Sequence, residues 1–184
     1  MRKDRSALRN RIEYAAFRAA RGLTGVLSSA ALARLGDVLG NFYSRLGGRR
    51  RDVIRYNLEL AFPDKTDDER DAIARGVARH FARSTLDAIR IQRLTPDELM
   101  STVTVHGWSN VESALERGRG IFFLTAHIGS WEVAALATGL LLPDPGLAVI
   151  NRPLDNPHLE KELARLRTLY GNHVFGKRNI LREM

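Results

Sequence analysis

The sequence predicts an α/β fold in which a helical amino-terminal region precedes a largely parallel sheet flanked by helices. Two observations predict it. Helical periodicity with capping signals fills most of the first hundred residues, and short apolar runs then alternate with amphipathic segments. The chain has 184 residues, enough for one domain with a real core. We therefore expect residues 1–100 and 101–184 to be two parts of one structural unit.

The helices of the amino-terminal region are marked by apolar spacing and by their ends. Three of them are expected over 49–62, 66–94 and 95–100. The first stops before Pro63. The other two each open with a threonine followed three residues later by a glutamate, which is a capping box.

Strands and helices alternate in the remainder of the chain. Apolar or alternating runs predict strands over 102–107, 120–126, 146–150 and 172–175. Amphipathic segments predict helices over 108–118, 130–142, 156–171 and 177–184. The run 120–126 is continuously apolar, as expected for a central strand buried on both faces.

The charge balance predicts an acidic partner, with a solvated basic face as an equal alternative. The formal net charge is +8, which suits nucleic acid, anionic lipid headgroups or an acidic carrier protein. Nucleic acid is less favoured, because the aromatic residues are few and do not alternate with the basic ones. The chain has no cysteine, which excludes disulfides, thiolate metal sites and a cysteine nucleophile.

The basic amino-terminal region also contains an uncharged run over 22–33. These 12 residues fall short of the roughly 18–20 that span a bilayer. We interpret the run as a helix lying in the membrane interface, with neighbouring arginines on anionic headgroups. A plain core helix is the alternative.

A lone histidine, His127, stands at the end of the apolar run 120–126, and Glu132 follows five residues later. With five histidines and 21 acidic residues in the chain, one such spacing is unsurprising by chance. The context adds a geometry. Gly129 suits a sharp turn after the strand and Ser130 suits a helix N-cap. His127 would then lie at the carboxyl end of a strand, where ligands bind in such sheets, with Glu132 in the next helical turn.

This geometry suits a general base. A carboxylate at Glu132 would fix the imidazole tautomer and stabilise the imidazolium, while the other ring nitrogen of His127 takes a proton from a hydroxyl. The alternative is a core or capping histidine whose glutamate only suits the helix dipole.

The other candidate residues are weaker. Arg152 follows the strand 146–150, and its planar donors suit a phosphate or carboxylate, although an exposed loop arginine is an equal alternative. Ser130 lacks the G-x-S-x-G elbow and is better interpreted as a cap than as a nucleophile. The remaining histidines stand singly, so no metal site is expected: His80, His106, His158 and His173.

Several segments together resemble the bacterial lipid A biosynthesis acyltransferases, the lauroyl/myristoyl-transferase type of the lysophospholipid acyltransferase-like group. The matching pieces are "RRRDVIRYNLELAFPDKTDDER", "VTVHGWSNVESALERGRGIFFLTAHIGSWEVAALA" and "VINRPLDNPHLEKELARLRTLYGN", in the family's order. The piece "LTAHIGSWE" is similar to the family's His-x-Gly-Asn-Trp-Glu block, with Ser130 where asparagine is common.

The resemblance implies acyltransferase-like αβα layers and a specific site. His127 would be the catalytic base and Glu132 its partner, while Arg152, Gly129 and Ser130 would bind substrate. An acyl chain would pass from an acyl-carrier-protein thioester to a hydroxyl of a lipid A precursor, with no cofactor and no metal. The expected partners are acyl carrier protein, an anionic membrane surface and the glycolipid acceptor. The expected location is the cytoplasmic face of the cell inner membrane, as a peripheral or monotopic protein.

The chain is shorter than the family members that it resembles. We therefore expect residues 1–100 to be the membrane-associating region, residues 101–184 to be the first part of the catalytic domain, and the sheet to be incomplete. Two alternatives follow: an acyl-CoA-dependent glycolipid acyltransferase, and a truncated, non-catalytic module that binds membrane or carrier protein.

Overall fold

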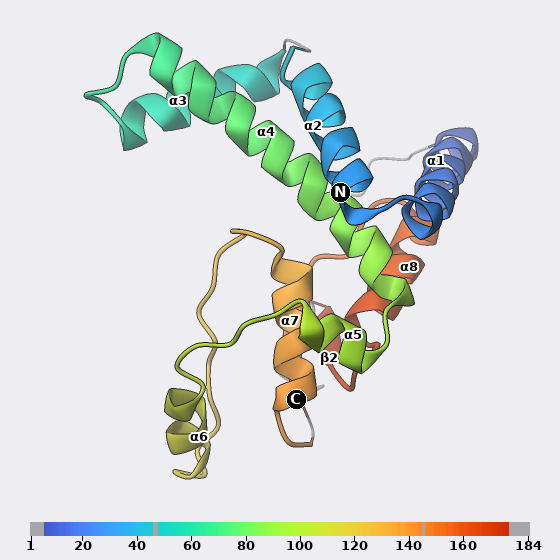
Figure 1. The fold of residues 1–184 in the computed structure, drawn as a ribbon, viewed down its shortest axis with the longest axis vertical. Coiled ribbons are helices and arrows are strands. Elements are labelled where there is room, and N and C mark those ends of the chain that lie inside the picture. Colours follow the sequence, from blue (N-terminus) through green and yellow to red (C-terminus); the bar gives the residue numbers. More distant parts are fainter. Residues whose placement is uncertain (1–5, 46–47, 145, 177–184) are drawn as a thin grey trace. The chain divides into compact units, whose positions relative to one another are not determined.

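The computed structural model describes residues 6–45, 48–144 and 146–176, which form two compact units (Figure 1). One unit is Ala15–Arg90. The other combines residues 6–14 with the described residues from Ile91 onward. Residues 6–14 thus belong with the second half of the chain, while the functional division at residue 100 stays a prediction.

The helices of the first hundred residues are α1 (Ala7–Val26), α2 (Ser29–Arg45), α3 (Arg49–Ala61), α4 (Asp67–Arg90), the 3₁₀ turn η1 (Ile91–Arg93) and α5 (Pro96–Ser101). They confirm the three predicted helices. Both predicted capping boxes form, since the threonine and glutamate side chains bond reciprocally to backbone N–H groups at the starts of α4 and α5. Within the described part of the chain, no helix is both long and apolar enough to cross a bilayer.

The uncharged run 22–33 is not one helix, so that prediction is wrong. The helix α1 ends at Val26 and α2 begins at Ser29. The hydroxyl of Ser28 accepts a hydrogen bond from the backbone N–H of Ala31 at 3.3 Å. Serine favours such a start because its side chain replaces a missing helical carbonyl.

The unit Ala15–Arg90 is held by close packing of α2 on α4 (Figure 1). Gly36 and Gly40 lie one turn apart on α2, and a Cβ at Gly40 would lie 2.4 Å from the Cα of Arg79. Only glycine permits that approach of the two backbones. Beside it, Nε and Nη2 of Arg83 donate to the two carboxylate oxygens of Asp37, which lowers the pKa of Asp37 below its ordinary value.

Gly40→Ala is expected to destabilise this unit by about 1–3 kcal/mol, because the added methyl forces the two backbones apart. Urea unfolding followed by helical circular dichroism measures the change. Gly76→Ala in α4 is the matched control, since a Cβ there meets nothing within 4 Å. It should be neutral or gain up to about 1 kcal/mol from helix propensity. Equal midpoints for the two variants would contradict the close packing.

The second unit contains α6 (Ser109–Leu115), α7 (Trp131–Leu141), β1 (Ala148–Asn151), α8 (Pro157–Arg167) and β2 (His173–Gly176). These confirm the helices predicted over 108–118, 130–142 and 156–171 and the strands predicted over 146–150 and 172–175. The two strands pair in parallel, with Val149 opposite Val174. The α/β class is confirmed with a small sheet, and the helix predicted over 177–184 lies outside the described residues.

The helices of this unit meet in a small apolar core. Leu99 of α5, Leu136 of α7 and Leu166 of α8 are almost completely buried. The amide of Asn172, just before β2, donates to the backbone oxygen of Ala135 in α7 at 3.0 Å. These contacts fix α7 against α8 and the sheet, which matters because the candidate site lies at the start of α7.

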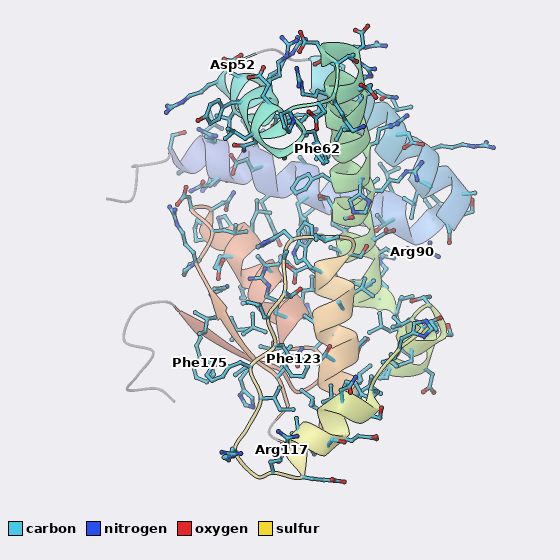
Figure 2. The ribbon with its side chains drawn as sticks, turned by 90° about the vertical axis from the view of Figure 1, so that its left-hand side faces the viewer. Asp52, Phe62, Arg90, Arg117, Phe123 and Phe175 are labelled. Atoms are coloured by element: carbon cyan, nitrogen blue, oxygen red, sulfur yellow. The ribbon has the colours of Figure 1, made fainter. Side chains whose placement is uncertain are left out.

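Two predicted strands, over 102–107 and 120–126, do not form in the structure. Figure 2 shows the segment around Phe123 as a loop. Phe122 and Leu124 are completely exposed instead of buried. A strand needs a hydrogen-bonded neighbour, and the only pairing among the described residues is that of β1 with β2. The apolar pattern of 120–126 indicates only a preference for strand conformation. It does not provide the second strand to which the backbone would have to bond.

Candidate active site

His127 lies in the bend between the extended segment 120–126 and α7. Its side chain is exposed. Gly129 has φ +64°, a left-handed conformation that glycine adopts without strain, so the predicted sharp turn forms there. Ser130 occupies the N-cap position of α7, but its hydroxyl makes no capping hydrogen bond.

Glu132 lies in the first turn of α7, as predicted, and is buried. Its carboxylate is bonded by a single guanidinium: Nε of Arg167 donates to Oε2 at 3.0 Å and Nη2 donates to Oε1 at 2.5 Å. The side chains of Arg167 and Glu132 are 17% and 11% exposed, so the pair is largely shielded from water. Arg167 stands in the last turn of α8, and the ion pair therefore joins the end of α8 to the start of α7.

Trp131 contacts both predicted catalytic residues. Its ring lies edge-on to the imidazole of His127, with centroids 5.1 Å apart. Its indole N–H donates to Oε1 of Glu132 at 3.2 Å. Among the described residues, no hydrogen bond joins His127 to Glu132 directly. The two residues therefore both contact the indole of Trp131. The imidazole of His127 is exposed to solvent, and the carboxylate of Glu132 is buried.

Arg152 directly follows β1, at the carboxyl end of the sheet, as predicted. Its side chain is 73% exposed and forms a long ion pair with Asp155, with Nη2 and Oδ1 3.9 Å apart. Within the described part of the chain, no hydrogen bond or ion pair joins Arg152 to His127 or Glu132. Its guanidinium thus lies in solvent beside Asp155.

Arg167 is the residue that sequence reasoning missed. The available signal was that a buried carboxylate needs a positive or hydrogen-bonding partner. The sequence of α8 offers Lys161, Arg165 and Arg167, and pattern alone does not choose among them. The choice depends on how α7 and α8 pack.

The arrangement offers an exposed imidazole for proton transfer, in contact with an indole whose N–H donates to a fixed, buried carboxylate. The N–H groups at the start of α7 add a partial positive charge that favours a developing oxyanion. Within the described ranges, no three acidic or histidine side chains lie close enough together to hold a metal ion.

Comparison with known proteins finds one family whose model covers all the candidate site residues. Residues 3–184 match the family model described as bacterial lipid A biosynthesis acyltransferase. The chain is 29% identical over 130 residues to the lipid A biosynthesis lauroyltransferase of Escherichia coli K12, covering 69% of this chain and 40% of that protein. It is 31% identical over 135 residues to a lipid A biosynthesis acyltransferase of Haemophilus influenzae, covering 70% and 40%.

A third relative is the lipid A biosynthesis palmitoleoyltransferase of Escherichia coli K12, which is 24% identical over 149 residues, with 81% of this chain and 48% of that protein covered. The chain thus spans less than half of the length of each of these relatives. No solved structure matches the chain significantly.

Proposed function

The chain belongs to the bacterial lipid A biosynthesis acyltransferase family, and from that premise we propose that it takes part in acyl transfer to a lipid A precursor. The observation that supports this most is the start of α7. There an exposed His127 and a buried Glu132 share contacts with Trp131. The acyl donor in this proposal is an acyl-carrier-protein thioester.

The proposed reaction needs one base and no covalent intermediate. The imidazole of His127 removes the proton from an acceptor hydroxyl, and the hydroxyl oxygen attacks the thioester carbonyl. The carbon–sulfur bond then breaks, and the departing thiolate receives the proton from the imidazolium. An ester and a free carrier thiol result, so atoms and charge balance.

In this proposal Glu132 and Arg167 act on the base from the buried side. The bidentate ion pair with Arg167 holds the carboxylate of Glu132 in one orientation. The carboxylate also accepts a hydrogen bond from the indole N–H of Trp131, whose ring contacts the imidazole of His127. The carboxylate thereby holds the Trp131 ring in one orientation, and with it the imidazole of His127 that contacts this ring. Arg152, exposed at the carboxyl end of β1, would bind a phosphate of the acceptor or the donor.

An exposed apolar face in the unit Ala15–Arg90 favours binding to a membrane surface. Val38 and Phe42 lie one turn apart on α2 and are 64% and 62% exposed. They lie nearly opposite the glycine face that packs on α4, because two residues turn a helix by about 200°. The net charge of +8 suits anionic headgroups next to such an apolar face. We propose peripheral or monotopic association with the cytoplasmic face of the inner membrane.

Phe42→Asp is expected to weaken binding to phosphatidylglycerol vesicles about tenfold, because the variant loses the transfer of one aromatic side chain into the interface. Asn41→Asp on the same helix adds the same charge without removing an apolar group, and should weaken binding much less. Vesicle sedimentation at two salt concentrations measures both. If the two variants bind equally, charge alone accounts for the association and the apolar face has no part in it.

The donor and acceptor are tested by acyl transfer with purified protein. We expect an acylated product from acyl carrier protein carrying a fatty acyl thioester and a lipid A precursor, with a much slower reaction from acyl-CoA. A faster reaction with acyl-CoA would replace the carrier protein as donor. Absence of product from both donors with a folded protein would contradict the proposed function.

A further inference from the structure

The amino terminus of α8 holds a buried asparagine that bonds to residues of α1. Asn156 is 1% exposed. Its side-chain oxygen accepts from the backbone N–H groups of His158 and Leu159, at 3.0 and 3.4 Å, which caps α8. Its Nδ2 donates to the backbone oxygen of Asn10 at 3.0 Å and to Oε2 of Glu13 at 2.9 Å. One side chain thus bonds to two elements that are 146 positions apart in the sequence.

Tyr14 adds a second contact between the same two helices. Its hydroxyl donates to Oε1 of Glu162 at 3.1 Å, and its ring centroid lies 5.3 Å from that of His158. On the α1 side, Nε of Arg9 donates to Oε1 of Glu13 at 3.0 Å, which fixes the carboxylate that Asn156 bonds. Residues 7–14 of α1 are therefore joined to the first turns of α8 by polar contacts.

Asn156 also ends the loop that carries Arg152. The backbone N–H of Leu154 donates to Oε2 of Glu160 at 2.6 Å, and the backbone oxygen of Asn156 accepts from the N–H of Glu160 at 2.9 Å. The loop 152–156 is thus held on the first turn of α8. The side chain that caps this turn is the one that holds α1.

We propose that Asn156 is a positioning residue: by joining residues 7–14 of α1 to the loop 152–156, it fixes Arg152 for binding of the glycolipid acceptor. This inference rests on the proposed function. A buried amide is costly unless its polar groups are paired, so loss of the α1 partners loosens the loop as well as α1. Residues 7–14 thus act on the proposed substrate site through Asn156.

Asn156→Asp separates the two roles of the side chain. Aspartate keeps an oxygen for the α8 cap, where it is as good as asparagine. It has no N–H for Asn10 or Glu13, and it places a negative charge beside Glu13. Asn57→Asp, at an exposed position in α3, is the control with the same change of charge.

For Asn156→Asp we expect amide hydrogen exchange to become about tenfold faster in residues 7–14 and 152–156, the effect of losing a buried hydrogen bond. The Kd for a lipid A precursor in detergent micelles should rise about tenfold, with kcat close to that of the wild type. Adding Glu13→Gln supplies an N–H toward the new carboxylate and should recover part of both losses. Asn57→Asp should change neither.

Unchanged exchange in residues 7–14 of Asn156→Asp would show that Asn156 does not hold α1. Faster exchange with an unchanged Kd would overturn the positioning role and leave Asn156 a purely structural residue. A folded wild-type protein without turnover would contradict the proposed function instead, and the exchange and Kd measurements would still decide the role of Asn156.

Discussion

Replacing His127 with alanine is expected to lower the turnover of acyl transfer by about 10²–10⁴-fold, the usual contribution of a general base. The imidazole is exposed and its ring contact is with Trp131, so its removal should cost little stability. The thermal midpoint should therefore stay near that of the wild type. Initial rates at saturating donor and acceptor, with the midpoint measured on the same samples, separate catalysis from folding.

His106→Ala is the matched control for this experiment. His106 is also exposed and lies outside the regular elements. We expect it to keep the turnover of the wild type. If both histidine variants lost turnover equally, a general effect on the protein would account for the loss and His127 would have no special role.

Arg167→Met is expected to have the largest effect on stability, about 3 kcal/mol, because it leaves the carboxylate of Glu132 buried without its charged partner. Arg165→Met is the control on the same helix, and its exposed side chain should contribute no more than about 0.5 kcal/mol. Urea unfolding gives both values. Equal stabilities for the two variants would contradict the role of the ion pair.

The double variant Arg167→Met with Glu132→Gln tests the reason for that loss. Removing both charges of a shielded pair is often close to neutral, so most of the stability should return. Turnover should not return, because the double variant lacks the bidentate ion pair that holds the carboxylate bonded to Trp131. If stability stayed low, packing of the arginine side chain would explain the loss and the buried charge would not.

The helices could be predicted from the sequence because their signals are local. The threonine–glutamate capping boxes at the starts of α4 and α5 lie within four residues, and the structure contains both. Gly129 likewise predicted its own turn. Such features depend on the backbone of a few neighbouring residues, so no other part of the chain has to be known.

The partners of buried polar groups could not be predicted in the same way. The sequence predicts that the carboxylate of Glu132 orients His127. In the structure this carboxylate accepts hydrogen bonds from Arg167. Asn156 was expected only at the start of a helix, and its amide bonds to α1. Each partner is fixed by the packing of elements distant in sequence. The same reason explains the run 120–126, whose strand pattern has no paired neighbour among the described residues.

The central claim is that His127 and the carboxylate anchored by Arg167 form one site for acyl transfer. Its most direct test is mass spectrometry of a lipid A precursor incubated with acylated carrier protein and either the wild type or His127→Ala. We predict that the wild type adds one ester-linked acyl chain and that His127→Ala, equally folded, forms about 10²–10⁴-fold less product. Equal amounts of product from the two proteins would contradict the claim.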